Sequence, residues 1–110
     1  MRGAPANEGL LKYQVFYSRR RTCQENNPPF TWADLTQTHV WVREVAADDQ
    51  DGSYCLMQAE KWSPTGQARE YILSLSLLHT SMYPGDVLHG EDGRYWECLP
   101  WDGWREAMPA

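Results

Sequence analysis

The amino-acid sequence predicts one α+β domain, in which a mainly antiparallel sheet of about four strands carries two helices on one face. Three observations lead to this prediction. Two segments in the N-terminal half alternate apolar and polar residues with the period of a β-strand. In the middle of the chain the apolar period lengthens to that of a helix. Two short segments around an Asp-Gly turn then follow near the C-terminus, so the expected order is ββααββ.

The first strand is expected at residues 11–17 and the second at residues 38–45, which are rich in β-branched residues. One face of the first strand would carry Leu11, Tyr13, Val15 and Tyr17. In the second strand, one face would carry Val40 and Val42, and the other His39, Trp41 and Arg43. Residues 1–9 are expected to form a loose leader, and residues 22–37 a long loop, because that segment contains several structure breakers.

Two helices are expected between the second strand and the third. Asp48 is a suitable N-cap for the first helix, which would end near Lys61. Its apolar stripe would consist of Cys55, Leu56, Ala59 and Trp62. The second helix would begin at Ser63 and Pro64, a strong start signal, and end near residues 79–80. Its apolar stripe would consist of Ala68, Tyr71, Ile72, Leu75 and Leu78.

The C-terminal part of the chain is expected to form a hairpin. Its strands would lie at residues 86–89 and 94–99. Between them, the pair Asp92-Gly93 supplies the positive φ that such a turn requires. After the second of these strands the chain would turn into a short tail.

Length and cysteine content narrow the class of protein. The 110 residues, of 12.8 kDa, fit a single domain. No apolar segment approaches the ~20 residues needed to span a bilayer, and the N-terminal segment lacks the apolar core of a secretory signal. Because three cysteines cannot all pair within one chain, we expect no disulfide scaffold and a reducing cytoplasm.

The charge is unevenly distributed along the chain. Ten basic and 15 acidic residues give −5 overall. Residues 1–21 contain five basic residues and one acidic residue, which gives a net charge of +4. Residues 22–110 contain five basic and 14 acidic residues, which gives a net charge of −9. Such an acidic body would repel a phosphate backbone, which argues against ordinary sequence-specific DNA binding. Only Arg19, Arg20 and Arg21 are candidates for a nucleic-acid contact, although such a triplet is also typical of a solvated strand end.

No catalytic signature is present, so we expect a non-enzymatic protein without metal or cofactor. The sequence lacks the Gly-x-Ser-x-Gly, P-loop and Gly-x-Gly-x-x-Gly motifs. Its three histidines and three cysteines do not form the close pairs typical of zinc sites. Cys55 falls on the predicted apolar stripe, and it is therefore expected to be a small buried hydrophobe.

The aromatic content exceeds what a core of this size needs. Six Trp and six Tyr occur in the chain, and exposed side chains of these types are favoured anchors at protein interfaces. Alternatively, they are half-buried fillers that cap the sheet. Because several have acidic neighbours, a protein partner is favoured over single-stranded nucleic acid. The candidate partner-binding residues are Trp41, Glu91, Asp92, Trp96, Trp101, Asp102 and Trp104.

Residues 79–87, His-Thr-Ser-Met-Tyr-Pro-Gly-Asp-Val, carry a resemblance to a known group of proteins. The segment resembles the motif His-Thr-Ser-Met-Ser-Val-Gly-Asp-Val of small uncharacterised proteins from bacterial plasmids, phages and integrative elements, and it is similar to the YodL-like domain. The similarity extends over about residues 38–106, and the chain departs from it at Tyr83-Pro84. The resemblance implies a place in the accessory gene pool of mobile elements. It transfers no catalytic residue, but it implies a tight strand entry with Gly85 at a special φ.

These observations favour a non-enzymatic accessory protein of a phage or plasmid that binds a host protein or nucleoprotein complex. The leading hypothesis is an anti-defence inhibitor such as an anti-CRISPR, because an acidic surface can occupy a protein surface that normally binds nucleic acid. The alternative is a nucleic-acid-binding module in replication, partition or conjugation of the element, acting through Arg19, Arg20 and Arg21. Either protein would act in the bacterial cytoplasm without a membrane, and the choice between monomer and dimer stays open.

Overall fold

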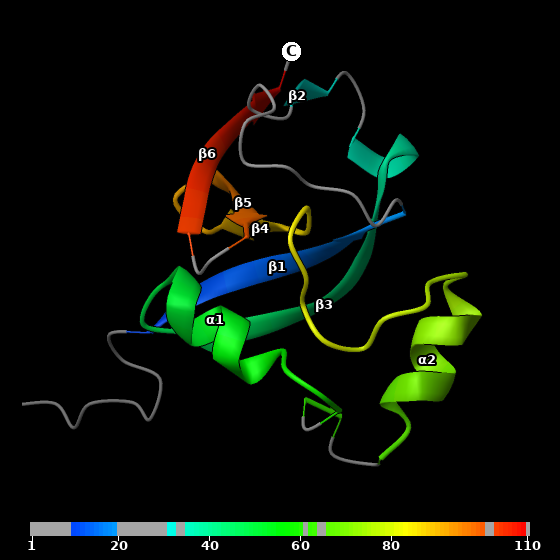
Figure 1. Ribbon diagram of the computed structural model, residues 1–110. Coiled ribbons are helices and arrows are strands. Elements are labelled where there is room, and N and C mark those ends of the chain that lie inside the picture. The colour runs from blue at the N-terminus through cyan, green and yellow to red at the C-terminus, as the bar shows by residue number, and fades with distance from the viewer. Residues whose placement is uncertain are drawn as a thin grey trace, which may run out of the picture.

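The computed structural model confirms the α+β class (Figure 1) and describes residues 10–19, 31–32, 35–60, 62–63, 66–100 and 103–109. Five antiparallel strands, two α-helices, a short 3-10 helix and a two-residue parallel strand make up this part of the chain. In chain order the elements are β1 (Leu11–Ser18), β2 (Thr31–Trp32), η1 (Leu35–Gln37), β3 (His39–Ala47), α1 (Gln50–Leu56), α2 (Ala68–Ser74), β4 (Val87–Gly90), β5 (Tyr95–Leu99) and β6 (Gly103–Pro109).

The strand order is β2-β6-β5-β4-β1-β3. The sheet therefore has two strands, β2 and β6, in addition to the four that the sequence predicted. The expected C-terminal tail is strand β6, which pairs antiparallel with β5 over residues 103–107. Its sequence is poor in β-branched residues, so pairing with a neighbour outweighs a weak local propensity. Residues 31–32, expected in the long loop, form β2 beside the end of β6. Residues 22–30 and 33–34 of that loop, together with residues 20–21 and the leader at 1–9, lie outside the described residues.

A β-bulge in β3 interrupts the alternation predicted for this strand. Val15 lies opposite Arg43 and Phe16 lies opposite Trp41, so Val42 is the extra residue. The burial pattern shifts at this point: Val42 and Val45 are both buried, although they are three residues apart. His39 was expected to share a face with Trp41, but it is only 4% exposed, whereas Trp41 is 48% exposed. In β1 the predicted alternation is confirmed from residue 13 to 17.

Helix α1 is shorter than predicted and packs through a different face. Asp49, not Asp48, is the N-cap, and its carboxylate accepts a hydrogen bond from Gly52 N at 2.8 Å. The helix ends at Leu56 rather than near residue 61, and both Cys55 and Leu56 are exposed. The prediction of a buried Cys55 is therefore wrong. The helix approaches β3 through its small residues instead, because Ser53 is fully buried and a Cβ at Gly52 would meet Ala47 at 3.2 Å.

Helix α2 begins four residues later than predicted and ends earlier. Its N-cap is Gln67, although the predicted cap Ser63 still accepts a hydrogen bond from Gln67 N at 3.1 Å. A Schellman motif ends the helix, with Ser76 at φ +62° and Leu77 N donating to Ile72 O at 3.1 Å. The left-handed residue turns the chain, so Leu77 becomes buried and Leu78, predicted to be buried, is 72% exposed.

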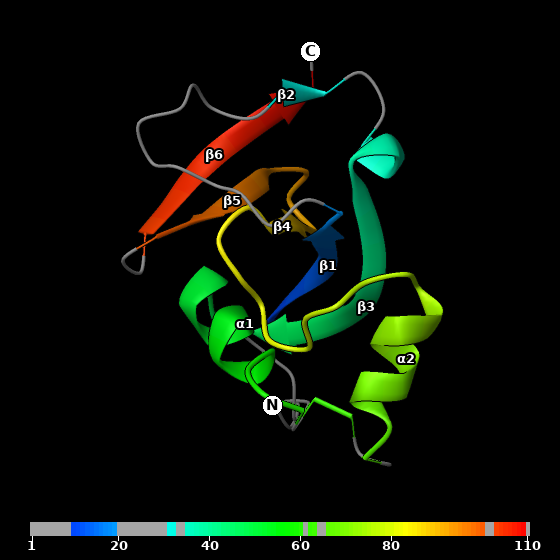
Figure 2. The same cartoon turned by 45° about the vertical axis from the view of Figure 1, so that its right-hand side comes forward.

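The main core lies between the sheet, the two helices and the segment at residues 77–86. In two views this segment (yellow) runs from α2 across β1 and β3 toward β4 (Figures 1 and 2). Met82 N donates to Met57 O at 2.9 Å, which ties it to the end of α1. Among the largest fully buried side chains of this core are Tyr17, Met57, Ile72, Met82 and Leu88. A smaller cluster on the opposite face of the sheet contains Phe16, Leu35, Tyr95 and Ala107.

Candidate functional site

The face of β1, β3 and β4 that points away from the main core carries the candidate site. We call it the outer face and define it as Lys12, Gln14, Trp41, Glu44, His89 and Glu91. Because Tyr13 and Val15 point into the core, the alternating residues Lys12 and Gln14 point away from it. The strand register places Glu44 and His89 on either side of Gln14.

A ladder of two hydrogen bonds crosses the outer face. Trp41 Nε1 donates to Gln14 Oε1 at 2.7 Å, and Gln14 Nε2 donates to Glu44 Oε1, also at 2.7 Å. The bulge at Val42 brings Trp41 opposite Phe16, two residues along β1 from Gln14. An exposed indole is therefore held in one orientation next to an exposed carboxylate.

A shallow hollow of about 360 Å³ lies beside this ladder. It is lined by Lys12, Gln14, Glu44, His89, Gly90, Glu91 and Gly93. Burial lowers the pKa of His89, against the opposing effect of the Asp92 carboxylate, so the ring is neutral at pH 7. Two carboxylates and one amine then carry the formal charge of the hollow, which makes it acidic.

The turn between β4 and β5 positions the acidic side chains at one end of the outer face. Glu91 N donates to Lys12 O at 3.0 Å, which fixes the turn to β1. Asp92 Oδ1 accepts a hydrogen bond from Arg94 N at 3.0 Å. Gly93 has φ +90°, which confirms the predicted positive φ in this turn.

The structure places three of the seven predicted partner-binding residues on the outer face or in the turn beside it. Trp41 belongs to the ladder, Glu91 lines the hollow, and Asp92 follows it in the turn. Trp96 and Trp104 lie on the core face, since both are half-buried and pack against the main core. The last two, Trp101 and Asp102, lie outside the described residues.

Trp96 and Trp104 both have partners within the chain. The guanidinium of Arg94 lies over the Trp96 ring, 4.6 Å from its centroid. Trp104 Nε1 donates to Asp51 Oδ1 at 2.8 Å, which joins β6 to α1. These contacts resemble the half-buried sheet caps that were the alternative interpretation of the aromatic residues.

Sequence reasoning missed four members of the outer face: Lys12, Gln14, Glu44 and His89. The alternation at residues 11–17 did indicate which side chains of β1 point outward. It contained no information on which residues of β3 and β4 lie opposite them, because register depends on long-range pairing.

Only Arg19 of the candidate nucleic-acid contacts is described. Its side chain is exposed, and its Nη2 donates to Thr36 O at 3.2 Å, while its backbone N donates to Thr38 O at 2.9 Å. Arg20 and Arg21 lie outside the described residues.

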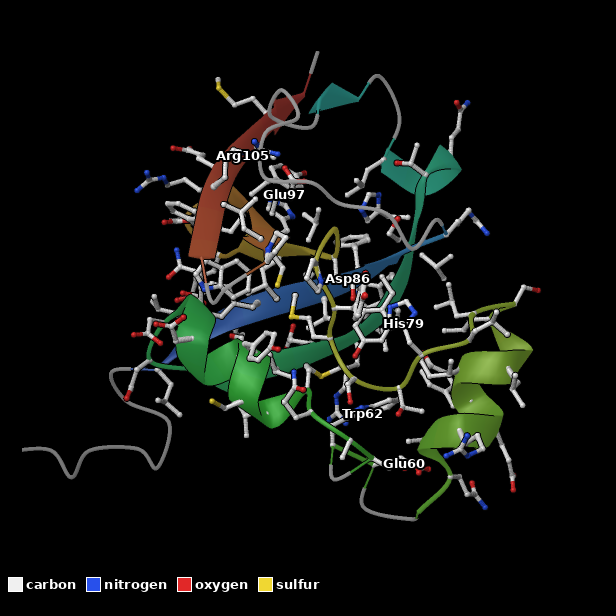
Figure 3. The ribbon with its side chains drawn as sticks, viewed as in Figure 1. Glu60, Trp62, His79, Asp86, Glu97 and Arg105 are labelled. Atoms are coloured by element: carbon white, nitrogen blue, oxygen red, sulfur yellow. The ribbon has the colours of Figure 1, made fainter. Side chains whose placement is uncertain are left out.

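Residues 79–86 contribute to a buried polar cluster around Asp86 (Figure 3). The Asp86 carboxylate accepts hydrogen bonds from Ser18 N and Tyr83 N at 2.7 Å each, and from His79 Nε2 at 3.0 Å. Burial raises the pKa of this carboxyl, and these hydrogen bonds oppose the effect. The adjoining Gly85 has φ +100°, the special φ that the resemblance implied for it. Because Asp86 is only 1% exposed, the cluster closes the segment onto β1 rather than facing a ligand.

No family model, curated protein or solved structure matches this chain. Among the residues that the structure describes, no group of three or more His, Cys, Asp or Glu side chains could hold a metal ion. Over the same residues, no helix is both long and apolar enough to cross a membrane.

Proposed function

We propose that this chain is a non-enzymatic accessory protein of a bacterial mobile element, which binds a host protein complex through the outer face and inhibits it. The observation that carries the proposal is Trp41, whose indole is about half exposed and is held by Gln14 beside the exposed carboxylate of Glu44. An oriented aromatic ring costs little conformational entropy on binding, which suits it as an interface anchor.

The charge of the protein supports a partner that handles nucleic acid. The chain has a net charge of −5, and the hollow lined by Gln14, Glu44 and Glu91 is acidic. A protein surface that binds phosphate is basic, so it complements this face and would lose access to its own ligand. The resemblance to mobile-element proteins supports a host defence complex as the target, and an anti-CRISPR is the form that this proposal favours.

The experiment is affinity capture of tagged protein from nuclease-treated lysate of a bacterial host, followed by reconstitution with the purified complex. We expect recovery of one nucleic-acid-processing complex, and loss of its nucleic-acid binding when the protein is added. Trp41→Ala should abolish both effects. Glu70→Gln, which removes a carboxylate from an exposed position on α2, is the matched surface control and should abolish neither.

Two results would contradict the proposal. Recovery of the complex without any change in its nucleic-acid binding would refute inhibition. Recovery only from lysate that has not been treated with nuclease would mean that nucleic acid forms the link. In that case the alternative function, a nucleic-acid-binding module that uses Arg19, Arg20 and Arg21, would be favoured instead.

A further inference from the structure

We propose that the outer face binds an arginine side chain of a basic protein partner, with its guanidinium on the Trp41 ring and its N–H groups on the Glu44 carboxylate. This inference rests on the proposed function for its biological setting, since it names the chemistry by which the same face recognises its partner. The binding site itself is formed by contacts within the chain.

The protein contains a complete example of such a site on its core face. Trp96 and Glu106 lie opposite each other on β5 and β6. Arg94 lies over the Trp96 ring, and its Nη2 and Nε donate to the two Glu106 carboxylate oxygens at 2.9 and 3.2 Å. An indole and a carboxylate on neighbouring strands are therefore sufficient to hold a guanidinium by stacking and by a bidentate ion pair.

The outer face has the same two groups, both on β3 and linked through Gln14 of the neighbouring strand β1, without an arginine of this chain between them. Trp41 and Glu44 are both exposed, and Gln14 links them. Arg43 is directed elsewhere, because its Nη1 donates to Trp62 O and its guanidinium lies over the Trp62 ring. Among the described residues, no cation stacks on Trp41 and no ion pair involves Glu44.

Arginine fits this face better than lysine. The guanidinium is planar, so it can stack on an indole and still direct paired N–H groups at a carboxylate, whereas an ammonium group is a compact and strongly hydrated point charge. Glu44 Oε1 accepts a hydrogen bond from Gln14 Nε2, and Glu91 adds a second carboxylate to the lining of the hollow. The acidic hollow also attracts a basic partner before contact.

The test is an NMR titration that follows the indole N–H resonance of Trp41 in the intact protein. The probes are blocked tri-arginine, tri-lysine and tri-citrulline peptides at equal ionic strength. Citrulline keeps the planar shape but lacks the charge. We expect tri-arginine to shift the Trp41 resonance with saturation, and tri-lysine to bind about fivefold more weakly. Tri-citrulline should cause no saturable shift.

Two matched variants separate a specific site from general attraction to an acidic protein. Glu44→Gln should weaken tri-arginine binding about fivefold or more, while Glu70→Gln, which removes the same charge from exposed α2, should leave it unchanged. The inference is overturned if the arginine and lysine peptides bind equally, or if the two variants have equal effects.

The peptide titration uses no host component, so its outcome is independent of the proposed function. If tri-arginine binds at Trp41 but no host complex is inhibited, the arginine site stands and the proposed function fails. If a host complex binds through Trp41 but the peptides do not discriminate, the proposed function stands and the arginine inference fails.

Discussion

His79 and Asp86, both in the segment that connects α2 to β4, form a buried hydrogen-bonded pair with 3.0 Å between Nε2 and Oδ2 (Figure 3). The His79 ring also stacks on Tyr17 of β1, with 4.5 Å between ring centroids. The Tyr17 hydroxyl donates to Thr80 O at 2.7 Å. His79, Thr80 and Asp86 therefore hold this segment against the sheet, which is a structural role.

Asp86→Asn should destabilise the protein strongly. The substitution removes a buried carboxylate that accepts hydrogen bonds from three N–H groups. The amide nitrogen of the new asparagine would face at least one of these donors and could not accept its hydrogen bond. We expect the free energy of unfolding to fall by about 3 kcal/mol, measured by urea denaturation. The control is Glu60→Gln, which breaks the exposed pair with Arg69 and should change stability by less than about 0.5 kcal/mol. Equal effects of the two substitutions would refute the structural role of Asp86.

Ser76→Gly should stabilise the protein. Ser76 has φ +62° at the C′ position of the Schellman motif that ends α2, where glycine carries no steric penalty from a Cβ. We expect a gain of about 1 kcal/mol in the free energy of unfolding, measured by thermal or urea denaturation. Ser74→Gly, two residues earlier and inside the helix, should instead lose about 0.5–1 kcal/mol. If both substitutions destabilise the protein, the left-handed conformation of Ser76 is not a source of strain.

Stability should decrease as the pH falls below about 6.5, in part because of His39. Burial lowers the pKa of His39 below 6.5, and the hydrogen bond to Gly85 O and the charge of Glu97 only partly oppose this. Between 6.5 and the lowered value, the unfolded chain binds a proton that the native state does not, so acidification favours unfolding. The slope for one such proton is at most about 1.4 kcal/mol per pH unit.

The contribution of His39 is measured by comparing the pH dependence of unfolding in the protein and in His39→Gln between pH 7.5 and 5. We expect a shallower slope in the variant. His89, whose pKa is also lowered, stays in both proteins, and Asp86, whose pKa is raised, acts with the opposite sign in both. The difference in slope therefore isolates His39, and identical slopes would contradict the prediction.

The sequence predicted those parts of the fold that depend on local pattern. Alternation from Tyr13 to Tyr17 predicted β1, and the Asp92-Gly93 pair predicted the last hairpin. Features that depend on long-range pairing were missed, because strand β6 and the bulge at Val42 exist only through their neighbours. Helix α1 was assigned the wrong face because it turns Gly52 toward Ala47 and buries Ser53, and no apolar stripe marks these two small residues.

The candidate site was predictable in part for the same reason. Trp41 and Glu91 were identified by residue type and by acidic neighbours, which are local signals. Gln14 has no such signal, since an outward-facing glutamine on a strand is usually a solvated residue. Its role is evident only from the register, which places it opposite Glu44 and within hydrogen-bonding distance of Trp41.

Gln14→Ala should loosen Trp41 without unfolding the protein. Gln14 contributes both hydrogen bonds of the ladder, and these are exposed, so we expect the free energy of unfolding to change by less than about 1 kcal/mol. The indole N–H of Trp41 should show increased motion on the picosecond to nanosecond timescale, measured as a lower heteronuclear NOE. Trp104 provides an internal reference, because Asp51 and not Gln14 accepts its indole N–H. If the substitution changes the NOE of neither Trp41 nor Trp104, the β3 backbone rather than Gln14 orients the Trp41 indole.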